Sequence, residues 1–289
     1  MSAHLIANRF AGKGLQALRH KLKDQAVEWH LPNSVDEAVE TIEQLRGNCE
    51  RLILAGGDGT FHLASQILGD GKTPDQVVGL IATGTGSDFM RSFDSPTLDE
   101  QIKSALTGGT AAFRPGLVEG ELGIRSFTNV ASLGVSAAVA HAVEGYLKKL
   151  GAFGYTVAMI QGILTYRSTP MTVHVDGELL MEGKGYLTAV GCGRFFGGGK
   201  MMTPHASPLS DQLHAVAVKD EGIVATLKAT RSLNTGDHIH LSLCEHAVGQ
   251  EIRISGEGLR SELDGELGPS GDLVVRRGPV AFQLAVPSR

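Results

Sequence analysis

The sequence contains few cysteines and no long apolar run, and both absences limit the classes of protein to which it can belong. Its three cysteines are odd in number and form no Cys-x-x-Cys pair. This number and spacing of cysteines is typical of proteins in a reducing compartment and not of secreted proteins stabilised by disulfides, so we expect a cytoplasmic location. No apolar run reaches the length of a membrane-spanning helix, since the stretch Thr156–Leu164 is broken by Gln161 and Gly162. The N-terminal residues 1–11 lack the pattern of a secretory signal and look like a first strand.

A surplus of positive charge is also missing. The chain has 26 Lys and Arg residues against 31 Asp and Glu residues, which gives a formal net charge of −5. Because general nucleic-acid binders carry a strongly basic surface, we expect no nucleic-acid partner. What the sequence does contain is glycine, 38 residues in a chain of 289, together with 42% hydrophobic residues. This composition is typical of a loop-rich α/β or α+β protein with one large domain or two modest ones.

The most informative stretch is Arg51–Thr60. It begins as a short apolar strand, Leu52–Ala55, and continues as a Gly-Gly-Asp-Gly-Thr turn that opens a helix over Phe61–Leu68. Glycines allow positive φ angles and close approach of a ligand, and the amides at a helix start are a natural seat for phosphate. The carboxylate of Asp58 would repel a phosphate unless a metal ion or a transferred proton gives it a role. The stretch therefore predicts phosphate chemistry with Mg²⁺, against the plainer alternative of an ordinary glycine-rich turn.

Two familiar phosphate-binding motifs do not fit the sequence. A Walker loop ending in the Gly-Lys-Thr of residues 71–73 would need a glycine at position 66, which is Gln66. The segment Gly84–Phe89 lacks the last glycine of a dinucleotide-binding fingerprint. This segment nevertheless follows the apolar strand Val77–Ala82 and, like the first loop, carries a Thr and an Asp. Since the carboxyl ends of parallel strands in open α/β sheets are where ligands bind, we expect both loops to contribute to one site.

The other elements of the N-terminal part complete an α/β pattern. A first strand, His4–Ala7, leads into Asn8–Gly14, a further candidate phosphate loop. Two helices are introduced by capping boxes, Ser34-x-x-Glu37 and Thr97-x-x-Glu100. We therefore predict that residues 1–117 form a Rossmann-like domain, a parallel sheet with helices on both faces.

After about residue 115 the pattern changes to short strands separated by Asp-Gly and glycine-rich turns. This predicts a mainly antiparallel β-sandwich domain over residues 118–280. A helical section is expected over Val135–Tyr166, and its stretch Tyr146–Tyr155 is either a lip for an amphiphilic substrate or ordinary packing. The predicted strands are Val118–Arg125, Thr172–Val175, Gly185–Val190, Leu213–Val218, His238–Leu243, Glu251–Ser255 and Leu273–Val275.

Several motifs, taken in this order and spacing, resemble the diacylglycerol kinase/sphingosine kinase-type lipid kinases, in particular their single-chain bacterial members. The first loop is also similar to that of NAD kinases and phosphofructokinases. The resemblance covers nearly the whole chain. The segments that carry it are Gly56–Thr60, Gly84–Phe89 with Arg91, Phe127–Gly134, Gly197–Ala206 with Asp211, and Leu263–Glu266.

The resemblance implies an ATP-dependent lipid kinase that uses Mg²⁺, with ATP in a cleft between two domains and a last strand, about 281–289, that returns to the first domain. Glu266 would accept the proton of the lipid hydroxyl, with Asp58 as the second candidate base and Asp264 beside them. A structural Mg²⁺ would be held by Asp211 and the backbone carbonyls of Pro208 and Leu213. The residues implied in ATP binding are Asn8, Gly12, Gly56, Gly57, Asp58, Gly59, Thr60, Thr85, Gly86 and Asp88.

The choice of Glu266 requires a decision between two Asp-Gly-Glu triplets. Asp176–Glu178 lies between two alternating stretches, which is the pattern of a hairpin turn. Asp264–Glu266 has the family's distance from the C-terminus, so we assign it to the site. The resemblance further implies a lipid substrate met at a membrane surface by peripheral contact, and a homodimer is left open.

Some residues depart from the family pattern, and other functions stay open. An NAD kinase shares the first loop, and an inactive nucleotide-binding regulatory protein would fit the altered residues. A serine hydrolase is disfavoured because residues 134–138 lack the last glycine of a nucleophile elbow. The pair His238-x-His240 has no third ligand at zinc spacing. The departures are Arg9, Pro32, His62, Leu63, Ser87 and Gln212.

Overall fold

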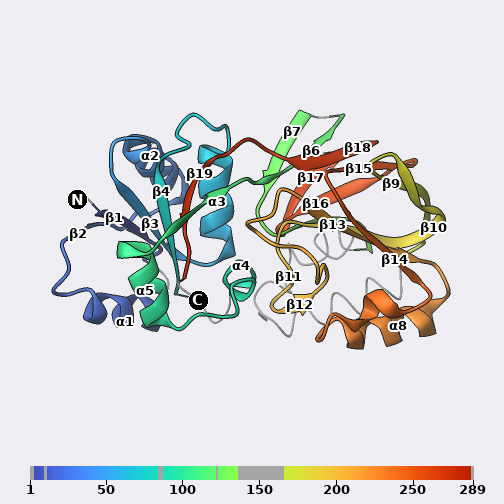
Figure 1. Ribbon diagram of the computed structural model, residues 1–289, viewed down its shortest axis with the longest axis horizontal. Helices are drawn as coiled ribbons and strands as arrows, with labels where there is room; N and C mark the ends of the chain where they lie inside the picture. The colour runs from blue at the N-terminus through green and yellow to red at the C-terminus, as the bar shows by residue number, and fades with distance from the viewer. Residues whose placement is uncertain (1–2, 10–11, 84–86, 122, 136–165, 288–289) are drawn as a thin grey trace. The chain divides into compact units, whose positions relative to one another are not determined.

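The computed structural model describes the chain except for residues 1–2, 10–11, 84–86, 122, 136–165 and 288–289. The chain divides into two compact units, Met1–Pro115 with Gly278–Arg289, and Gly116–Arg277. The divisions fall at 115/116 and 277/278, compared with the predicted 117/118 and 280/281. The predicted fold classes, α/β for the first unit and antiparallel β for the second, are confirmed (Figure 1).

The first unit is a six-stranded sheet with helices. Its strands are β1 (Ala3–Ala7), β2 (Val27–His30), β3 (Arg51–Gly56), β4 (Val77–Ala82), β5 (Thr110–Phe113) and β19 (Phe282–Ala285). Its helices are α1 (Lys13–Lys21), α2 (Val35–Leu45), α3 (Asp58–Leu68), α4 (Asp88–Arg91) and α5 (Leu98–Thr107). The strand order is β2-β1-β3-β4-β19-β5, and only the pair β19–β5 is antiparallel. The last strand therefore returns to the first unit and lies inside its sheet.

Helices cover both faces of this sheet because strand β3 is apolar on both. Successive side chains of a strand point to opposite faces. Leu52 and Leu54 pack in one buried cluster with residues of α2 and α3. Ile53 and Ala55 pack in another with residues of α1 and α5. The doubly covered sheet is what the continuous apolar runs in the sequence predicted.

The strand order changes direction between β1 and β3, which is the point where open α/β sheets bind ligands. The hydrogen-bond ladder continues past the strand ends there. The amide of Asn8 donates to the carbonyl of Ala55 at 3.0 Å, and the amide of Thr83 donates to that of Gly56 at 3.0 Å. The loops after β1, β3 and β4 are thus held side by side at one edge of the sheet.

Four buried phenylalanines form the support beneath these loops. The rings of Phe61 and Phe89, from α3 and α4, lie 4.3 Å apart between centroids. Phe113 and Phe282, from β5 and β19, stack at 5.0 Å. The phenylalanine rings meet in one cluster, so the first turns of α3 and α4 rest on a rigid apolar base.

The second unit is an eleven-stranded antiparallel sheet folded on itself around an apolar core. Its path runs β17-β16-β8-β10-β9-β15-β18-β6-β7, with β13 paired to β10 and β14 paired to β13. Its strands are β6 (Gly116–Gly120), β7 (Gly123–Phe127), β8 (Val130–Gly134), β9 (Thr169–Val175), β10 (Glu178–Gly191), β13 (Leu213–Lys219), β14 (Cys244–Gly249), β15 (Glu251–Ser255), β16 (Arg260–Leu263), β17 (Glu266–Ser270) and β18 (Leu273–Arg277). The remaining elements are a small hairpin of β11 (Phe195–Phe196) with β12 (Lys200–Met201), the helix α8 (Ile223–Ser232) and the 3₁₀ helix η2 (Asp237–His240).

Two of the predicted strands are wrong. The stretch predicted as one strand, Val118–Arg125, is the hairpin β6–β7, in which Gly120 pairs with Gly123. The stretch His238–Leu243 begins as the end of η2, because Gly236 adopts a left-handed conformation (φ 84°) and turns the chain. His238 and Ile239 are both buried although adjacent in sequence, which a strand with one buried face does not allow.

The helical section expected over Val135–Tyr166 falls almost entirely outside the described residues, and so does the predicted lip Tyr146–Tyr155. The candidate nucleophile of the serine-hydrolase segment 134–138, Ser136, is likewise outside the described residues. Among the residues that the structure describes, no helix combines the length and apolarity needed to cross a bilayer.

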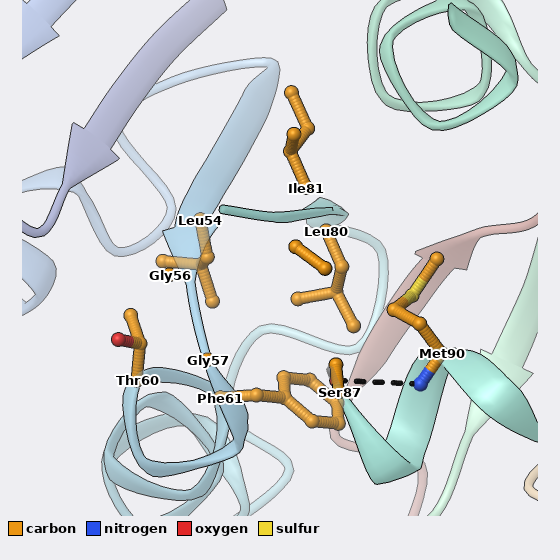
Figure 2. Close-up of a pocket in the computed structure, with 10 residues that line it drawn as sticks. Leu54, Gly56, Gly57, Thr60, Phe61, Leu80, Ile81, Ser87 and Met90 are labelled. Atoms are coloured by element: carbon orange, nitrogen blue, oxygen red, sulfur yellow. Dashed lines mark hydrogen bonds between the residues drawn. The ribbon is translucent and has the colours of Figure 1, made fainter. Parts of the chain in front are cut away.

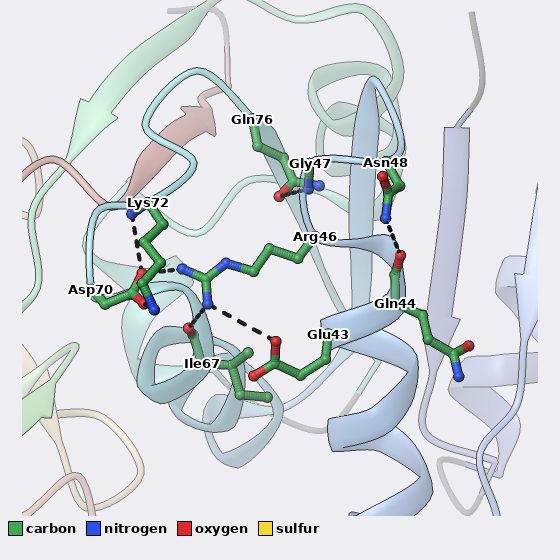
Figure 3. Close-up of polar contacts among 9 residues, drawn as sticks. All are labelled: Glu43, Gln44, Arg46, Gly47, Asn48, Ile67, Asp70, Lys72 and Gln76. Atoms are coloured by element: carbon green, nitrogen blue, oxygen red, sulfur yellow. Dashed lines mark hydrogen bonds and ion pairs between the residues drawn. The ribbon is translucent and has the colours of Figure 1, made fainter.

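Figure 3 shows a polar contact that ties the ends of two helices together. Arg46 caps the end of α2, and its Nη1 donates to the carbonyl of Ile67, in the last turn of α3, at 3.0 Å. Its Nη2 is paired with the Asp70 carboxylate just beyond that helix. The side chain of Arg46 is 12% exposed, whereas that of Glu43, 4.0 Å away, is 53% exposed. A guanidinium at this position satisfies a helix-end carbonyl that has no partner within the helix.

We therefore expect Arg46→Ala to lower the free energy of unfolding by roughly 1–3 kcal/mol, because it leaves the buried end of α3 with the Ile67 carbonyl unpaired. The Asp70 carboxylate loses the guanidinium but keeps its contacts with Lys72. Urea denaturation followed by circular dichroism measures the effect. Glu43→Ala is the matched control and should stay within roughly 0.5 kcal/mol of wild type, since its contact with Arg46 is long and solvated. Equal effects of the two substitutions would contradict the assigned role of Arg46.

Candidate active site

The predicted phosphate loop lies at the N-terminus of α3. Gly57 is the N-cap residue, with an extended backbone (φ −108°) and no side chain to cap the helix. Added methyl groups at Gly57 or Gly59 would meet no atom of the described residues within 4 Å. At Gly56, by contrast, a Cβ would lie 2.2 Å from Oγ1 of Thr60. None of these three glycines has a positive φ angle, so that part of the prediction is wrong. Gly57 and Gly59 leave the backbone accessible, as the other part predicted, whereas Gly56 allows Thr60 to pack closely.

Open space beside helix-start amides is the arrangement that anions need. The amide of Thr60 already donates to the carbonyl of Gly57, at 3.0 Å. The amides of Asp58 and Gly59 precede it, in the turn whose N–H groups have no partner within the helix. A ligand phosphate at this point would meet both amides and the positive end of the helix dipole.

A pocket opens beside this turn (Figure 2). Its volume is about 230 Å³, including the part that is open to solvent. Apolar side chains from β3, β4, α3 and α4 surround it, while backbone and hydroxyl groups contribute the polar part. The lining residues are Leu54, Gly56, Gly57, Thr60, Phe61, Leu80, Ile81, Ala82, Ser87 and Met90. Both loops predicted to share a site therefore line one pocket.

The carboxylate of Asp58 joins the two loops. Its Oδ1 accepts hydrogen bonds from Oγ of Ser87 at 2.6 Å and from the amide of Phe89 at 3.1 Å. Its Oδ2 accepts from the amide of Asp88 at 2.9 Å. A residue in the first turn of α3 thus caps the N-terminus of α4. This role was not predicted, and it uses most of the acceptor capacity that a Mg²⁺ ion or a proton would need. The roles of Asp58 as a metal ligand or base stay predictions.

The other residues of the first unit assigned to ATP are placed around the same edge. The side chain of Asp88 is buried, and its Oδ1 lies 3.5 Å from Nε of Arg91. Asn8 is exposed at the end of β1, and Gly12 precedes α1 with a left-handed φ of 55°. Thr85 and Gly86 lie outside the described residues.

In the second unit, the Asp264-Gly265 pair forms the turn between β16 and β17, with φ angles of 51° and 99°. The Asp264 carboxylate accepts from the amides of Thr128, Asn129 and Val130 at 2.6–3.0 Å, and from the Thr128 hydroxyl at 2.8 Å. Asp264 therefore fixes the bend between β7 and β8. Contact of this side chain with a reacting group stays a prediction.

The pattern used to separate the two Asp-Gly-Glu triplets does not separate them. The Asp176-Gly177 pair is also a two-residue hairpin turn, with φ angles of 50° and 86°. Its carboxylate also accepts backbone amides, those of Gln250 and Glu251. A hairpin turn is thus common to both triplets, and the assignment of Glu266 rests on the family resemblance alone. Glu266 is exposed, at the first position of β17.

Sequence reasoning missed Glu262, which lies beneath this turn. Its Oε2 accepts from Oγ of Ser132 at 2.7 Å, and its Oε1 accepts from the amide of Gly265. Burial raises the pKa of Glu262 to about 7, and the nearby carboxylates of Asp264 and Glu266 act in the same direction. The available signal was a charged residue at a strand position directly opposite a serine, but the pairing of β16 with β8 was needed to see it.

The residues predicted to hold a structural Mg²⁺ lie in the loop before β13. Asp211 is exposed, Pro208 is buried, and Leu213 is the first residue of the strand. The guanidinium of Arg277 already lies in this loop, donating to the carbonyl of Ser207 at 2.7 Å and that of Gln212 at 3.4 Å. A fixed positive charge among these carbonyls reduces the need for a cation, so the loop does not by itself fit a metal ion, and that assignment stays a prediction.

These features define a class of protein: an open α/β sheet with glycine-rich loops at its carboxyl edge, followed by an antiparallel β unit. Comparison with known families agrees. Residues 2–117 match the model of the diacylglycerol kinase catalytic domain. Residues 129–286, more than half of the chain, match the model of the YegS C-terminal NAD kinase beta sandwich-like domain. The chain therefore belongs to the diacylglycerol kinase-like family of kinases that combines these two domains, as the resemblance predicted.

Individual relatives are distant but cover the whole chain. A diacylglycerol kinase of Mycobacterium tuberculosis is 23% identical over 290 residues, which is 99% of this chain and 93% of the relative. The crystal structure of a diacylglycerol kinase from Bacillus anthracis superposes with a TM-score of 0.74 at 18% identity, covering 99% of this chain and 96% of that one. An Archaeoglobus fulgidus NAD kinase in complex with ATP has a TM-score of 0.54 at 12% identity, covering 100% and 94%. At these identities the two structures show the fold alone.

The Asp58 contacts give a first prediction for this site. In Asp58→Asn, the amide nitrogen must replace one carboxylate oxygen, and it will then face a backbone N–H of Asp88 or Phe89 wherever it lies. We expect the free energy of unfolding, measured without nucleotide, to fall by roughly 1–3 kcal/mol. Ser87→Ala removes one donor to Asp58 and the long 3.4 Å cap of the Met90 amide, and it leaves the amides of Asp88 and Phe89 paired with Asp58. It should therefore cost less, roughly 0.5–1.5 kcal/mol. Wild-type stability of Asp58→Asn would rule out the loop-joining role.

The buried Glu262 gives a second prediction. Because its folded pKa of about 7 exceeds the 4.5 of an ordinary glutamate, the folded state holds the proton more tightly, and stability falls as pH rises between these values. The loss is on the order of 3 kcal/mol at most. Glu262→Gln keeps a neutral group that can pair with both Ser132 and Gly265. We expect the difference in unfolding free energy between the variant and wild type to shift in favour of the variant from about pH 5 to pH 7, and to stay constant at higher pH. Parallel pH profiles of unfolding free energy would contradict this.

Proposed function

We propose that this chain transfers the γ-phosphate of ATP, supplied as its Mg²⁺ complex, to a hydroxyl group of a lipid. The observation that carries the proposal is the open, uncapped start of α3 at the switch point of the sheet, in a chain that belongs to a kinase family. The relatives named diacylglycerol kinase favour a lipid acceptor of the diacylglycerol kind.

The nucleotide's phosphates are assigned to the first turn of α3. The amides of Asp58 and Gly59 would donate to phosphate oxygens, and the space at Gly57 and Gly59 would let the phosphates approach the backbone. Bound Mg²⁺ would offset the negative charge of the phosphates. Asp58 would serve the reaction chiefly by holding the loop of Ser87–Phe89 against this turn, since three donors already use its oxygens.

The proton acceptor is assigned to Glu266. In the transfer, the lipid oxygen forms a bond to the γ-phosphorus, the bond from that phosphorus to the bridging oxygen of ADP breaks, and the hydroxyl proton passes to the acceptor. Glu266 is exposed and follows a turn whose position is fixed by the four hydrogen bonds of Asp264. An accessible carboxylate on a rigid turn is suited to this task, whereas the carboxylate of Asp58 is engaged. Glu262, buried below the same turn, would keep the turn in place.

The lipid would be met at a membrane surface through peripheral contact. The second candidate function is that of an NAD kinase, because a solved NAD kinase and a solved NADH kinase share the fold. Their TM-scores, 0.54 and 0.57, are lower than the 0.74–0.76 of the diacylglycerol kinase structures, so this candidate ranks second. An inactive nucleotide-binding protein is the third. The three candidate functions differ in the acceptor of the γ-phosphate, which is a lipid, NAD or neither.

The test is to incubate the purified protein with Mg²⁺ and γ-labelled ATP, in parallel with a total lipid extract and with NAD. A labelled lipid, separated by thin-layer chromatography, is the expected result. Label in NADP would establish the second candidate, and ATP binding with no transfer to either acceptor would establish the third. Either of these outcomes would overturn the lipid-kinase proposal.

The role of Glu266 is tested by Glu266→Gln, which should retain ATP affinity and lose roughly 10²–10⁴-fold in turnover, the usual contribution of a general base. Glu178→Gln is a matched control, because Glu178 is also exposed and also follows an Asp-Gly hairpin turn. It should leave turnover unchanged. A Glu266→Gln enzyme as active as the Glu178→Gln enzyme would refute the assignment.

A further inference from the structure

Three histidines that are far apart in the sequence meet in the second unit. His205 lies in the loop after β12, His214 lies on β13 and His246 lies on β14. Each histidine contributes one ring nitrogen, and these three nitrogens all lie within 4.8 Å of one another. The ring centroids are separated by 4.9, 5.5 and 5.5 Å. We call these three residues the histidine cluster.

The pairing of β13 with β14 explains how two members meet. His214 lies opposite Val248 and His246 lies opposite Val216, so the two histidines are diagonal neighbours on one face of the strand pair. The adjacent residue Ala215 points to the other face, into the core of the unit. The third member is brought in by its own backbone, because the amide of His205 donates to Nδ1 of His214 at 3.1 Å.

The cluster contains imidazoles and no carboxylate. His214 is fully buried, His246 is partly buried and His205 is exposed, so the cluster connects the interior of the unit to solvent. Nε2 of His214 and Nδ1 of His246 are 3.4 Å apart. Two ligands bound 2.0–2.1 Å from a tetrahedral zinc ion are separated by about 3.3 Å, so this pair already has the separation that a metal ion needs.

We propose that His205, His214 and His246 bind a transition-metal ion of the Zn²⁺ class, with a fourth position open to water. Imidazole nitrogen suits Zn²⁺ and related ions, whereas Mg²⁺ prefers oxygen ligands, so this site would be distinct from the Mg²⁺ of the nucleotide. Three histidines with one open position form a known zinc coordination pattern.

Metal binding would change the hydrogen bonds within the cluster. The ion replaces the hydrogen bond between His214 and His246, and His214 coordinates through Nε2. Its Nδ1 then carries the proton, so it donates to the backbone of Thr203 and no longer accepts from the amide of His205. The ring of His214 is also hydrogen-bonded to the backbone of Thr203, and a backbone partner of this kind commonly fixes the tautomer of a metal-bound histidine. The result would be a cross-link between the loop at residues 203–206 and the strand pair β13–β14.

A second group with metal-ligand atoms lies in the first unit and serves as the alternative in the test. It consists of His4, Glu28 and His30 on β1 and β2. Glu28 is exposed, and its carboxylate oxygens lie 3.6 Å from Nδ1 of His4 and 3.7 Å from Nε2 of His30. The histidine cluster is the stronger candidate because one of its members is fully buried.

The test is zinc binding to the whole chain, prepared without a polyhistidine tag, stripped with a chelator and kept in excess Mg²⁺. We expect calorimetry to give one Zn²⁺ per chain, and Co²⁺ to give the visible absorption of a tetrahedral nitrogen site. His205→Ala and His246→Ala should each weaken Zn²⁺ binding by at least about 100-fold, since loss of an outer partner alone costs 10–100-fold. Zn²⁺ should raise the melting temperature of the wild type and not that of either variant.

His174→Ala is the matched control, because His174 lies on β9 of the same unit, outside the cluster. It should bind Zn²⁺ as the wild type does. Circular dichroism of the metal-free variants checks that each is folded, and the exposed His205 gives a variant with little effect on the core. Binding that survives in both cluster variants, binding lost in His30→Ala, or no stoichiometric binding by the wild type would each overturn the proposal.

Discussion

The first unit depends on one carboxylate that serves two helices. Asp58 stands in the first turn of α3 and accepts the hydroxyl of Ser87 and the amides of Asp88 and Phe89. The loops after β3 and β4 therefore cannot move independently, and the phenylalanine cluster beneath them resists the same motion. If the site binds a flexible polyphosphate, as proposed, this rigidity avoids the loss of affinity that ordering the loops on binding would cause. The contacts of Asp58 give an acidic residue in this glycine-rich turn a structural role that is independent of any catalytic one.

Much of the first unit follows from local sequence. Apolar runs of four to six residues predicted buried parallel strands, and glycine-rich turns predicted their carboxyl ends. The box at Thr97 and Glu100 is complete. At Ser34 only half of it forms, since the carboxylate of Glu37 accepts from Asn33 instead of the cap residue. The strand predicted over His238–Leu243 is wrong because the local alternation of apolar and polar residues does not reveal that Gly236 has turned the chain just before it.

What the sequence did not predict are pairs of side chains brought together by strand register. Glu262 meets Ser132 only because β16 lies beside β8, and the histidine cluster forms only because β13 and β14 are aligned as they are. A shift of one residue in either pairing would place these groups on opposite faces. The two Asp-Gly turns make the same point. Asp176 and Asp264 stand in hairpin turns of similar geometry, and both carboxylates accept backbone amides. The local sequence pattern therefore could not tell which triplet belongs to a site.

The position of β19 has a consequence for biosynthesis. This strand is inserted between β4 and β5, so the sheet of the first unit lacks an internal strand until residues 282–285 have been synthesised. While the ribosome is still producing residues 116–277, the edges of β4 and β5 are unpaired, and unpaired strand edges invite aggregation. The sheet of the first unit therefore cannot be completed before all of the second unit has been synthesised.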